Sequence, residues 1–272
     1  NGNEFTTSVT GVKPAVDSQA LALPLIGGTK EFAPVVKGLA AIRGYSIQPD
    51  KIRELQEPDA GINLKADGSN LASVLKFLTK ESKTDMNRLC ELLDSVVPNT
   101  KTVRTKQHGK RLSLEFVQEW MDKEGNPKQV PFEAYSMSDG TLRALGVLAA
   151  FFQVARPTLV AIEEPEATIH PEALGTILDA IRGFSRDTQV VVTTHSPELL
   201  DADWIGSNNL RIVTWEQGVT RVRPLGKASV NALQKHLMGA GEQLRANALR
   251  PDTVDLFAEE GNGQMELFED TL

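Results

Sequence analysis

Cysteine is almost absent from this sequence. The single Cys90 excludes an internal disulfide and any metal site built from several cysteines, and its setting in RLCELLD is typical of an apolar helix face. Long apolar runs are absent as well, since none approaches the roughly 18 residues that a membrane span needs. The first residues, NGNEFTTSVTG, lack the charged and apolar regions of a secretory signal. We therefore expect a cytoplasmic protein that has no membrane partner.

The formal net charge of −7 is unevenly distributed along the chain. The tail from Pro251 to Leu272 contains seven of the 36 acidic residues and no lysine or arginine, which leaves 29 acidic against 29 basic residues in the rest of the chain. Because the body is formally neutral, the net charge neither favours nor excludes nucleic acid as a partner.

The hydrophobic pattern of the chain becomes regular near residue 67. Residues 1–66 have no sustained hydrophobic period. Leu71, Val74, Leu75 and Leu78 then recur at helical spacing after a cap at Asp67 or Ser69, and a second helix is expected over 84–97. Stretches 101–106, 111–120 and 129–135 alternate and are separated by turn residues, which predicts an antiparallel meander.

After Tyr135 the pattern becomes an alternation of helices and strands. We expect strands over 158–164 and 188–195, since these runs are apolar without alternation, as in parallel strands covered on both faces. One helix separates them, as in a βαβ unit. Gln217-Gly218 is expected to turn a hairpin. The remaining segments are predicted as helices over 138–155, 170–184 and 196–201, the last capped by Ser196.

Polar side chains end both of these strands. Glu163 and Glu164 follow the first, with Glu166 after a proline, and Thr193, Thr194 and His195 follow the second. Ligands of parallel sheets bind beyond the carboxyl ends of the strands. Two acids at such an edge suit a Mg²⁺-phosphate centre, in which one organises the ion and the other activates a water. His195 would contact the terminal phosphate or position the nucleophile.

Each piece also has an ordinary structural interpretation. An acidic loop after a strand commonly leads into a helix N-terminus. His195 alone is typical of a hydrogen-bonded turn residue, and SMSDGTLRAL alone is an ordinary helix start with Ser138 or Asp139 as cap. Their occurrence together in this order favours a shared site.

The ordered set resembles the ABC-type ATPases of the RecF and SMC branch, in particular stand-alone AAA-type ATPases related to the OLD proteins. YSMSDGTLR resembles the ABC signature segment, TLVAIEEPEATIHP the Walker B strand with its D-loop, and VVVTTHSPELLD the switch-histidine strand. The resemblance covers roughly Asp67 to Leu225. It implies an α/β P-loop NTPase core with a mostly parallel sheet flanked by helices, an antiparallel meander and a small helical lobe.

The resemblance also implies a domain organisation. It divides the chain into an amino-terminal segment (1–66), a helical subdomain (67–100), the ATPase core (101–225) and a carboxyl-terminal helix with its acidic tail (226–272).

The resemblance further implies roles for individual residues. Glu163 takes the magnesium position, Glu164 is the general base and His195 is the switch histidine. The D-loop residues are Ala167, Thr168 and His170. The expected cofactors are ATP and Mg²⁺. The residues expected to face the nucleotide of an opposing subunit are Ser138, Asp139, Gly140, Thr141 and Arg143.

Three departures from the family pattern stand out. Asp139 replaces a glycine and needs a compensating cation, from Arg143 or from a partner. Glu163 replaces the commoner aspartate. No G-x-x-x-x-G-K-[ST] phosphate loop (Walker A) is present in the sequence. We therefore expect this chain to be the carboxyl-terminal portion of an ATPase whose phosphate loop lies outside it, with a degenerate relative as the alternative.

The function that the resemblance implies is an ATPase subunit. ATP would join two copies through the signature and D-loop segments, and hydrolysis would drive an effector protein, such as a nuclease, in DNA repair or anti-phage defence. Two alternatives remain open: a non-hydrolysing interaction module of the same fold, and a metal-dependent nuclease that uses Glu163, Glu164 and Glu166.

Two further segments have competing interpretations. The stretch KTVRTKQHGKR is either a DNA-backbone contact or a solvated hairpin. The segment MELFEDTL at the end of the chain is either a docking peptide or disordered.

Overall fold

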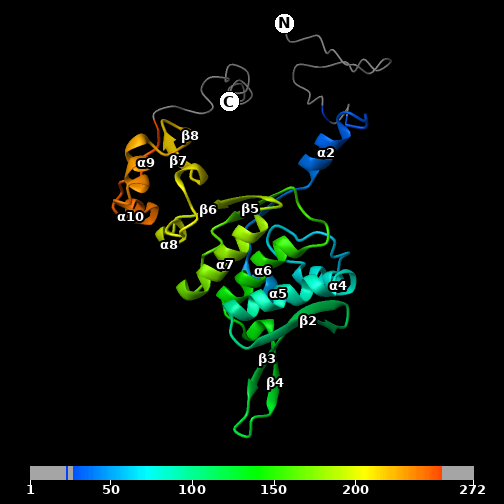
Figure 1. Ribbon diagram of the computed structural model, residues 1–272. Helices are drawn as coiled ribbons and strands as arrows, with labels where there is room; N and C mark the ends of the chain where they lie inside the picture. Colours follow the sequence, from blue (N-terminus) through cyan, green and yellow to red (C-terminus); the bar gives the residue numbers. More distant parts are fainter. Residues whose placement is uncertain (1–22, 24–26, 253–272) are drawn as a thin grey trace. The chain divides into compact units, whose positions relative to one another are not determined.

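The computed structural model describes Leu23 and residues 27–252 (Figure 1). The segments NGNEFTTSVTG and MELFEDTL lie outside these residues. The described residues fall into two compact units, the first ending at Thr193 and the second beginning at Thr194. The domain boundaries expected from the sequence stay a prediction.

A three-stranded parallel sheet lies in the first unit. Its strand order is β1-β5-β6, with β5 in the centre. The predicted pairing of the two later strands is confirmed, because β5 and β6 are adjacent and parallel with Glu163 opposite Thr193. β1 joins β5 on its other side and lies in the part of the chain without a sustained period. The bounds are β1 Ile42–Tyr45, β5 Leu159–Glu163 and β6 Gln189–Thr193.

The two faces of this sheet are buried to different degrees. Tyr45, Val160 and Ile162 point to one face and are buried. On the opposite face, Ile42 and Val191 are 43% and 44% exposed. The expectation that the strands are covered on both faces is therefore not met in the described part of the chain. We call the exposed side the open face; its members are Ile42, Gly44, Leu159, Ala161, Glu163, Gln189, Val191 and Thr193.

A layer of helices lies between this sheet and a second, antiparallel sheet (Figure 1). α6 packs against β5, and its Phe151 stacks on Phe184 of α7 with ring centroids 4.7 Å apart. The predicted apolar stripe of α4 is buried, although Asn70 rather than Asp67 or Ser69 precedes the helix. The helices of this unit are α2 Ala33–Ala40, α3 Pro49–Arg53, α4 Leu71–Glu81, α5 Lys83–Val96, α6 Asp139–Phe152 and α7 Pro171–Phe184.

The predicted meander is the antiparallel sheet β2-β3-β4. Residues 112–117 of β3 form its buried middle, and α4 and α5 contact β2. A short 3-10 helix, η1 (Ala134–Ser136), connects the last strand to α6. The strand bounds are β2 Thr100–His108, β3 Arg111–Met121 and β4 Pro127–Glu133.

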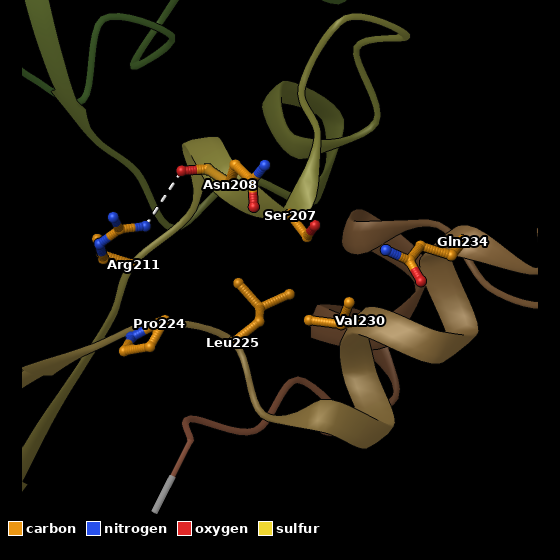
Figure 2. A pocket seen from close by; sticks show the side chains of 7 residues that line it. All are labelled: Ser207, Asn208, Arg211, Pro224, Leu225, Val230 and Gln234. Atoms are coloured by element: carbon orange, nitrogen blue, oxygen red, sulfur yellow. Dashed lines mark hydrogen bonds between the residues drawn. The ribbon is translucent and has the colours of Figure 1, made fainter. Parts of the chain in front are cut away.

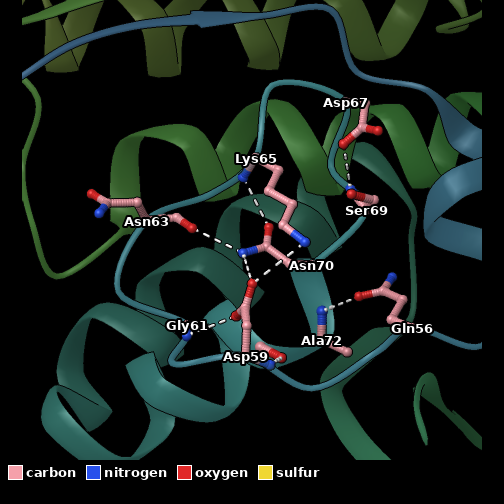
Figure 3. A network of polar contacts seen from close by, with 10 residues as sticks. Gln56, Asp59, Gly61, Asn63, Lys65, Asp67, Ser69, Asn70 and Ala72 are labelled. Atoms are coloured by element: carbon pink, nitrogen blue, oxygen red, sulfur yellow. Dashed lines mark hydrogen bonds and ion pairs between the residues drawn. The ribbon is translucent and has the colours of Figure 1, made fainter.

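Buried amides fix the long connection between α3 and α4 (Figure 3). The Asn70 side chain is 2% exposed; it donates to Asp59 Oδ2 and to the Asn63 carbonyl, and it accepts from the Lys65 N–H. Gln56 accepts from the Ala72 N–H in the same way. Because each buried polar group has a partner, an irregular segment can cover the core without an unpaired amide.

The second unit contains short helices and a hairpin. Gln217 and Gly218 have φ angles of 51° and 85°, which confirms the predicted tight turn. Ser196 caps α8 by accepting from the Leu199 N–H, as expected. The bounds are α8 Pro197–Leu200, η2 Ser207–Asn209, β7 Ile212–Glu216, β8 Val219–Arg223, α9 Lys227–Gln234 and α10 Ala240–Arg245. Across the described residues, no helix has the length and apolar character that crossing a membrane requires.

Candidate functional site

Glu163 and Glu164, at the end of β5, leave the sheet in different ways. Glu163 is the last residue of β5, and its side chain lies on the open face beside that of Thr193. Glu164 has a φ of 40°, in the left-handed region, and its N–H donates to the Thr193 carbonyl at 2.9 Å. Both side chains are exposed. A non-glycine residue in this conformation stores strain, and such strain clusters at functional sites.

The loop after β5, residues 164–170, is folded by its own backbone. The Ala167 N–H donates to the Glu164 carbonyl at 3.0 Å, and the Ile169 N–H donates to the Glu166 carbonyl at 3.0 Å. Thr168 has a φ of 65°. His170 then caps α7, since its Nδ1 accepts from the Glu172 N–H. Capping gives His170 a structural role, and its role in a D-loop stays a prediction.

The signature segment, residues 135–143, contains the N-terminus of α6. Ser138 is the N-cap: its hydroxyl accepts from the Thr141 N–H at 3.2 Å and lies 2.9 Å from the Thr141 hydroxyl. Ser138 and Asp139 are exposed, whereas Thr141 is buried. A helix of 14 residues with an exposed N-terminus presents N–H groups and a positive dipole end to an anion.

Gly140 brings the signature segment against the loop after β5. A Cβ at Gly140 would overlap the Thr168 carbonyl oxygen and would lie 3.4 Å from the Ile169 Cα. The two backbones are therefore in direct contact. Two of the three predicted motifs meet in the first unit, and only glycine fits between them.

A cation from an earlier helix neutralises Asp139. The Arg53 Nη2 lies 2.5 Å from the Asp139 Oδ1. This hydrogen bond raises the pKa of the Arg53 guanidinium above its ordinary value. The sequence suggested Arg143 or a partner for this task, but the structure pairs Asp139 with Arg53. The Arg143 Nε is buried without a hydrogen-bond partner in the described part of the chain.

His195 belongs to the second unit, two residues beyond the end of β6. Its approach to the glutamates stays a prediction. The helix that follows it, α8, is held by α10: Arg245 contacts Glu198 and Asp201, each at 3.0 Å, and the Gly241 N–H donates to Asp201 at 2.9 Å. The turn that contains His195 is thus attached to a braced helix.

Four of the five basic residues in the segment that could contact DNA, 101–111, pair with glutamates. Arg104 lies 2.6 Å from the Glu115 carboxylate, and Lys106 lies between Glu115 and Glu133. Arg104 lowers the pKa of the nearly buried Glu115. Lys101 and Arg111 pair with Glu119 and Glu57. This pairing favours the structural hairpin over a DNA contact.

Two other possible sites contribute little. A cavity of about 340 Å³ in the second unit is lined by Arg211, Leu225 and Val230 among others, but the Arg211 guanidinium already donates to the Asn208 and Leu210 carbonyls (Figure 2). Within the residues that the structure describes, no three His, Cys, Asp or Glu side chains gather into a metal cluster. Mg²⁺ commonly uses one or two carboxylates with waters and phosphates, and Glu163 fits that need.

Comparison with known families decides the affiliation. A family model described as "AAA domain, putative AbiEii toxin, Type IV TA system" matches residues 30–201, more than half of the chain. The chain belongs to this AAA family. The α/β architecture, with a parallel sheet, flanking helices and a separate antiparallel sheet, is that of a P-loop NTPase, as the motifs predicted. No curated protein matches the chain.

Among the solved structures that are similar to this AAA protein, two come from work on SMC proteins. A structure from work on "ATP-driven dimerization and DNA stimulated activation of SMC ATPases" is 15% identical, with a TM-score of 0.43; the match covers 60% of this chain and 96% of that one. An Smc head domain with a coiled coil from Pyrococcus yayanosii is 17% identical, with a TM-score of 0.40; the match covers 60% of this chain and 30% of that one.

Proposed function

We propose that this AAA protein binds and hydrolyses ATP, and that ATP joins two copies whose opening and closing act on nucleic acid through an effector protein. DNA repair and anti-phage defence are the processes proposed. The observation that supports hydrolysis is the strand edge at which Glu163 lies beside Thr193 and Glu164 adopts a left-handed conformation.

The open face supports the proposal that the phosphate loop is supplied from outside this chain. It is apolar through Ile42, Leu159, Ala161 and Val191, and it ends in Glu163 at its carboxyl edge. Exposed apolar sheet faces favour burial against a further layer. A layer bearing the G-x-x-x-x-G-K-[ST] motif would bring its lysine and N–H groups to this same edge.

The proposed roles at the strand edge follow from charge and position. Glu164 accepts a proton from the attacking water as the bond between the γ-phosphorus and the bridging oxygen breaks, which releases ADP and phosphate. Glu163 would hold Mg²⁺, whose charge offsets that of the phosphates. His195 would contact the γ-phosphate from the second unit.

The signature segment is proposed to act on the nucleotide of an opposing copy. Ser138 and Gly140 at the N-terminus of α6 offer a hydroxyl and N–H groups, and the loop with Thr168 contacts Gly140 in the same chain. The same surface of each copy would then contribute both the signature segment and the D-loop to the dimer interface.

The test is Glu164→Gln in the complete ATPase, with the phosphate loop in place. We expect turnover to fall about 10²- to 10⁴-fold, since a general base is lost. The ATP-bound dimer should persist, as measured by light scattering. The matched control is Glu172→Gln, in the first turn of α7, which should hydrolyse ATP at the wild-type rate.

Other outcomes distinguish the alternatives. Unchanged hydrolysis in Glu164→Gln would remove Glu164 from the role of base. An assembled protein that dimerises without hydrolysing ATP would be the interaction module. Nucleic-acid cleavage with metal and without nucleotide would indicate the nuclease.

A further inference from the structure

Arg53 contacts the chain on both sides of Ser138. Its Nη2 donates to the Met137 carbonyl at 3.2 Å and to the Asp139 carboxylate at 2.5 Å. Ser138 lies between these two residues and caps α6. A single guanidinium nitrogen thereby fixes the backbone before the cap and the side chain after it.

The helix that bears Arg53 is anchored in the core. Ile52, the preceding residue, is fully buried, and a Cβ at Gly146 of α6 would lie 3.2 Å from it. Gln56, after the helix, donates to the Ile52 carbonyl and pairs with Leu112 of β3. Arg53 itself is only 21% exposed. Its guanidinium is therefore placed by packed structure and not by a freely moving side chain.

The ion pair between Arg53 and Asp139 has an electrostatic effect on the signature segment. Asp139 puts a carboxylate into the first turn of α6, where it would repel a phosphate that approaches the N–H groups of the helix. The side chain of Asp139 is 54% exposed, so its charge would act on an approaching phosphate unless a cation offset it. Arg53 supplies that cation from the same chain.

We propose that Arg53 is the positioning residue of the signature segment, which neutralises Asp139 and orients Ser138 for the triphosphate of an opposing copy. This inference rests on the proposed function. We assign Arg53 a positioning role because three of its five guanidinium N–H groups are already used, one by Asp50 at 2.6 Å and two by Met137 and Asp139. The aspartate that replaces a glycine in the signature is thus accommodated by a dedicated arginine.

The test is a double-mutant cycle in the complete ATPase. We expect Arg53→Ala to weaken ATP-driven dimerisation about tenfold or more, with a higher KM for ATP, since Asp139 then repels the phosphate. Adding Asp139→Asn removes the carboxylate and should recover most of the loss. Arg53→Gln keeps much of the side chain without the charge and should behave like Arg53→Ala. The control Arg88→Ala, at an exposed position of α5, should match the wild type.

The outcomes separate this inference from the proposed function. Thermal unfolding of each variant identifies a loss of fold, and Arg53→Gln serves where Arg53→Ala does not fold. A wild-type protein that dimerises with ATP, together with Arg53 variants that dimerise equally well, overturns the role of Arg53 alone. Failure of Asp139→Asn to rescue shows a merely structural contact and also overturns it. A wild-type protein that neither binds ATP nor dimerises overturns both proposals.

Discussion

At the scale of single residues, Glu164 combines a proposed chemical role with an unfavourable backbone. Its φ of 40° costs an L-residue energy that glycine does not incur. The hydrogen bond from its N–H to Thr193 holds the turn in place. Function and stability therefore make opposite demands on this position.

We predict that Glu164→Gly is more stable than Glu164→Ala by about 1 kcal/mol, because both lose the carboxylate and only glycine relieves the strain. Urea unfolding of the two variants measures the difference. Equal stabilities would show that the turn is unstrained. Neither variant should hydrolyse ATP.

Residue roles could be read from the sequence only where the partners are close along the chain. Ser196 was predicted as a cap, and Ser138 or Asp139 as another, because a cap and the N–H that donates to it lie within one turn. The partner of Asp139 was not found, since Arg53 lies 86 positions earlier in a segment without periodicity. Arg143, one helical turn away, was the nearer candidate and is not the partner.

At the scale of elements, hydrophobic period predicted the long helices, because each buries one stripe, and continuous apolar runs predicted β5 and β6. β1 was missed because it is four residues long and only Tyr45 is buried. The coverage of the sheet was also misread. Val190, Val191 and Val192 form a continuous apolar run, which looks the same whether one face or both are covered.

The ion pairs that join α8 to α10 lead to a prediction about the pH dependence of stability. The Glu198 N–H, Arg245 and Ser196 lower the pKa of Glu198 from 4.5 to about 2. A lowered pKa stabilises the folded state above pH 4.5, and that contribution is lost as the pH falls toward 2. We expect the second unit to unfold at lower temperature across this window.

Arg245→Met should reduce this pH dependence, because the methionine keeps the packing and removes the cation. Since the pair is exposed, high salt should reduce the effect too. Circular dichroism melts between pH 5 and pH 2 provide the measurement. A variant with the wild-type slope would assign the effect to other carboxylates.

At the scale of the whole molecule, two valines of the parallel sheet differ in burial, because one lies on the open face and the other on the covered face. We predict that Val191→Thr, made in this chain without the layer that bears the phosphate loop, changes the free energy of unfolding by less than about 0.5 kcal/mol. Val160→Thr, on the covered face, should cost about 1–3 kcal/mol, since it buries a hydroxyl. Urea unfolding compares the two.

Binding of a hydrophobic dye tests the same surface. The dye should bind less to Val191→Thr than to the wild type. Dye binding that does not change would place the exposed apolar surface elsewhere.

The close approach of Gly140 to Thr168 has a mechanical consequence. With backbone against backbone and no side chain between them, there is no slack at this joint, so a tilt of α6 has to push the loop that follows the glutamates. We expect the start of α6 and the loop that contains Thr168 to move together as a rigid unit, so that bending of the first unit occurs at other positions.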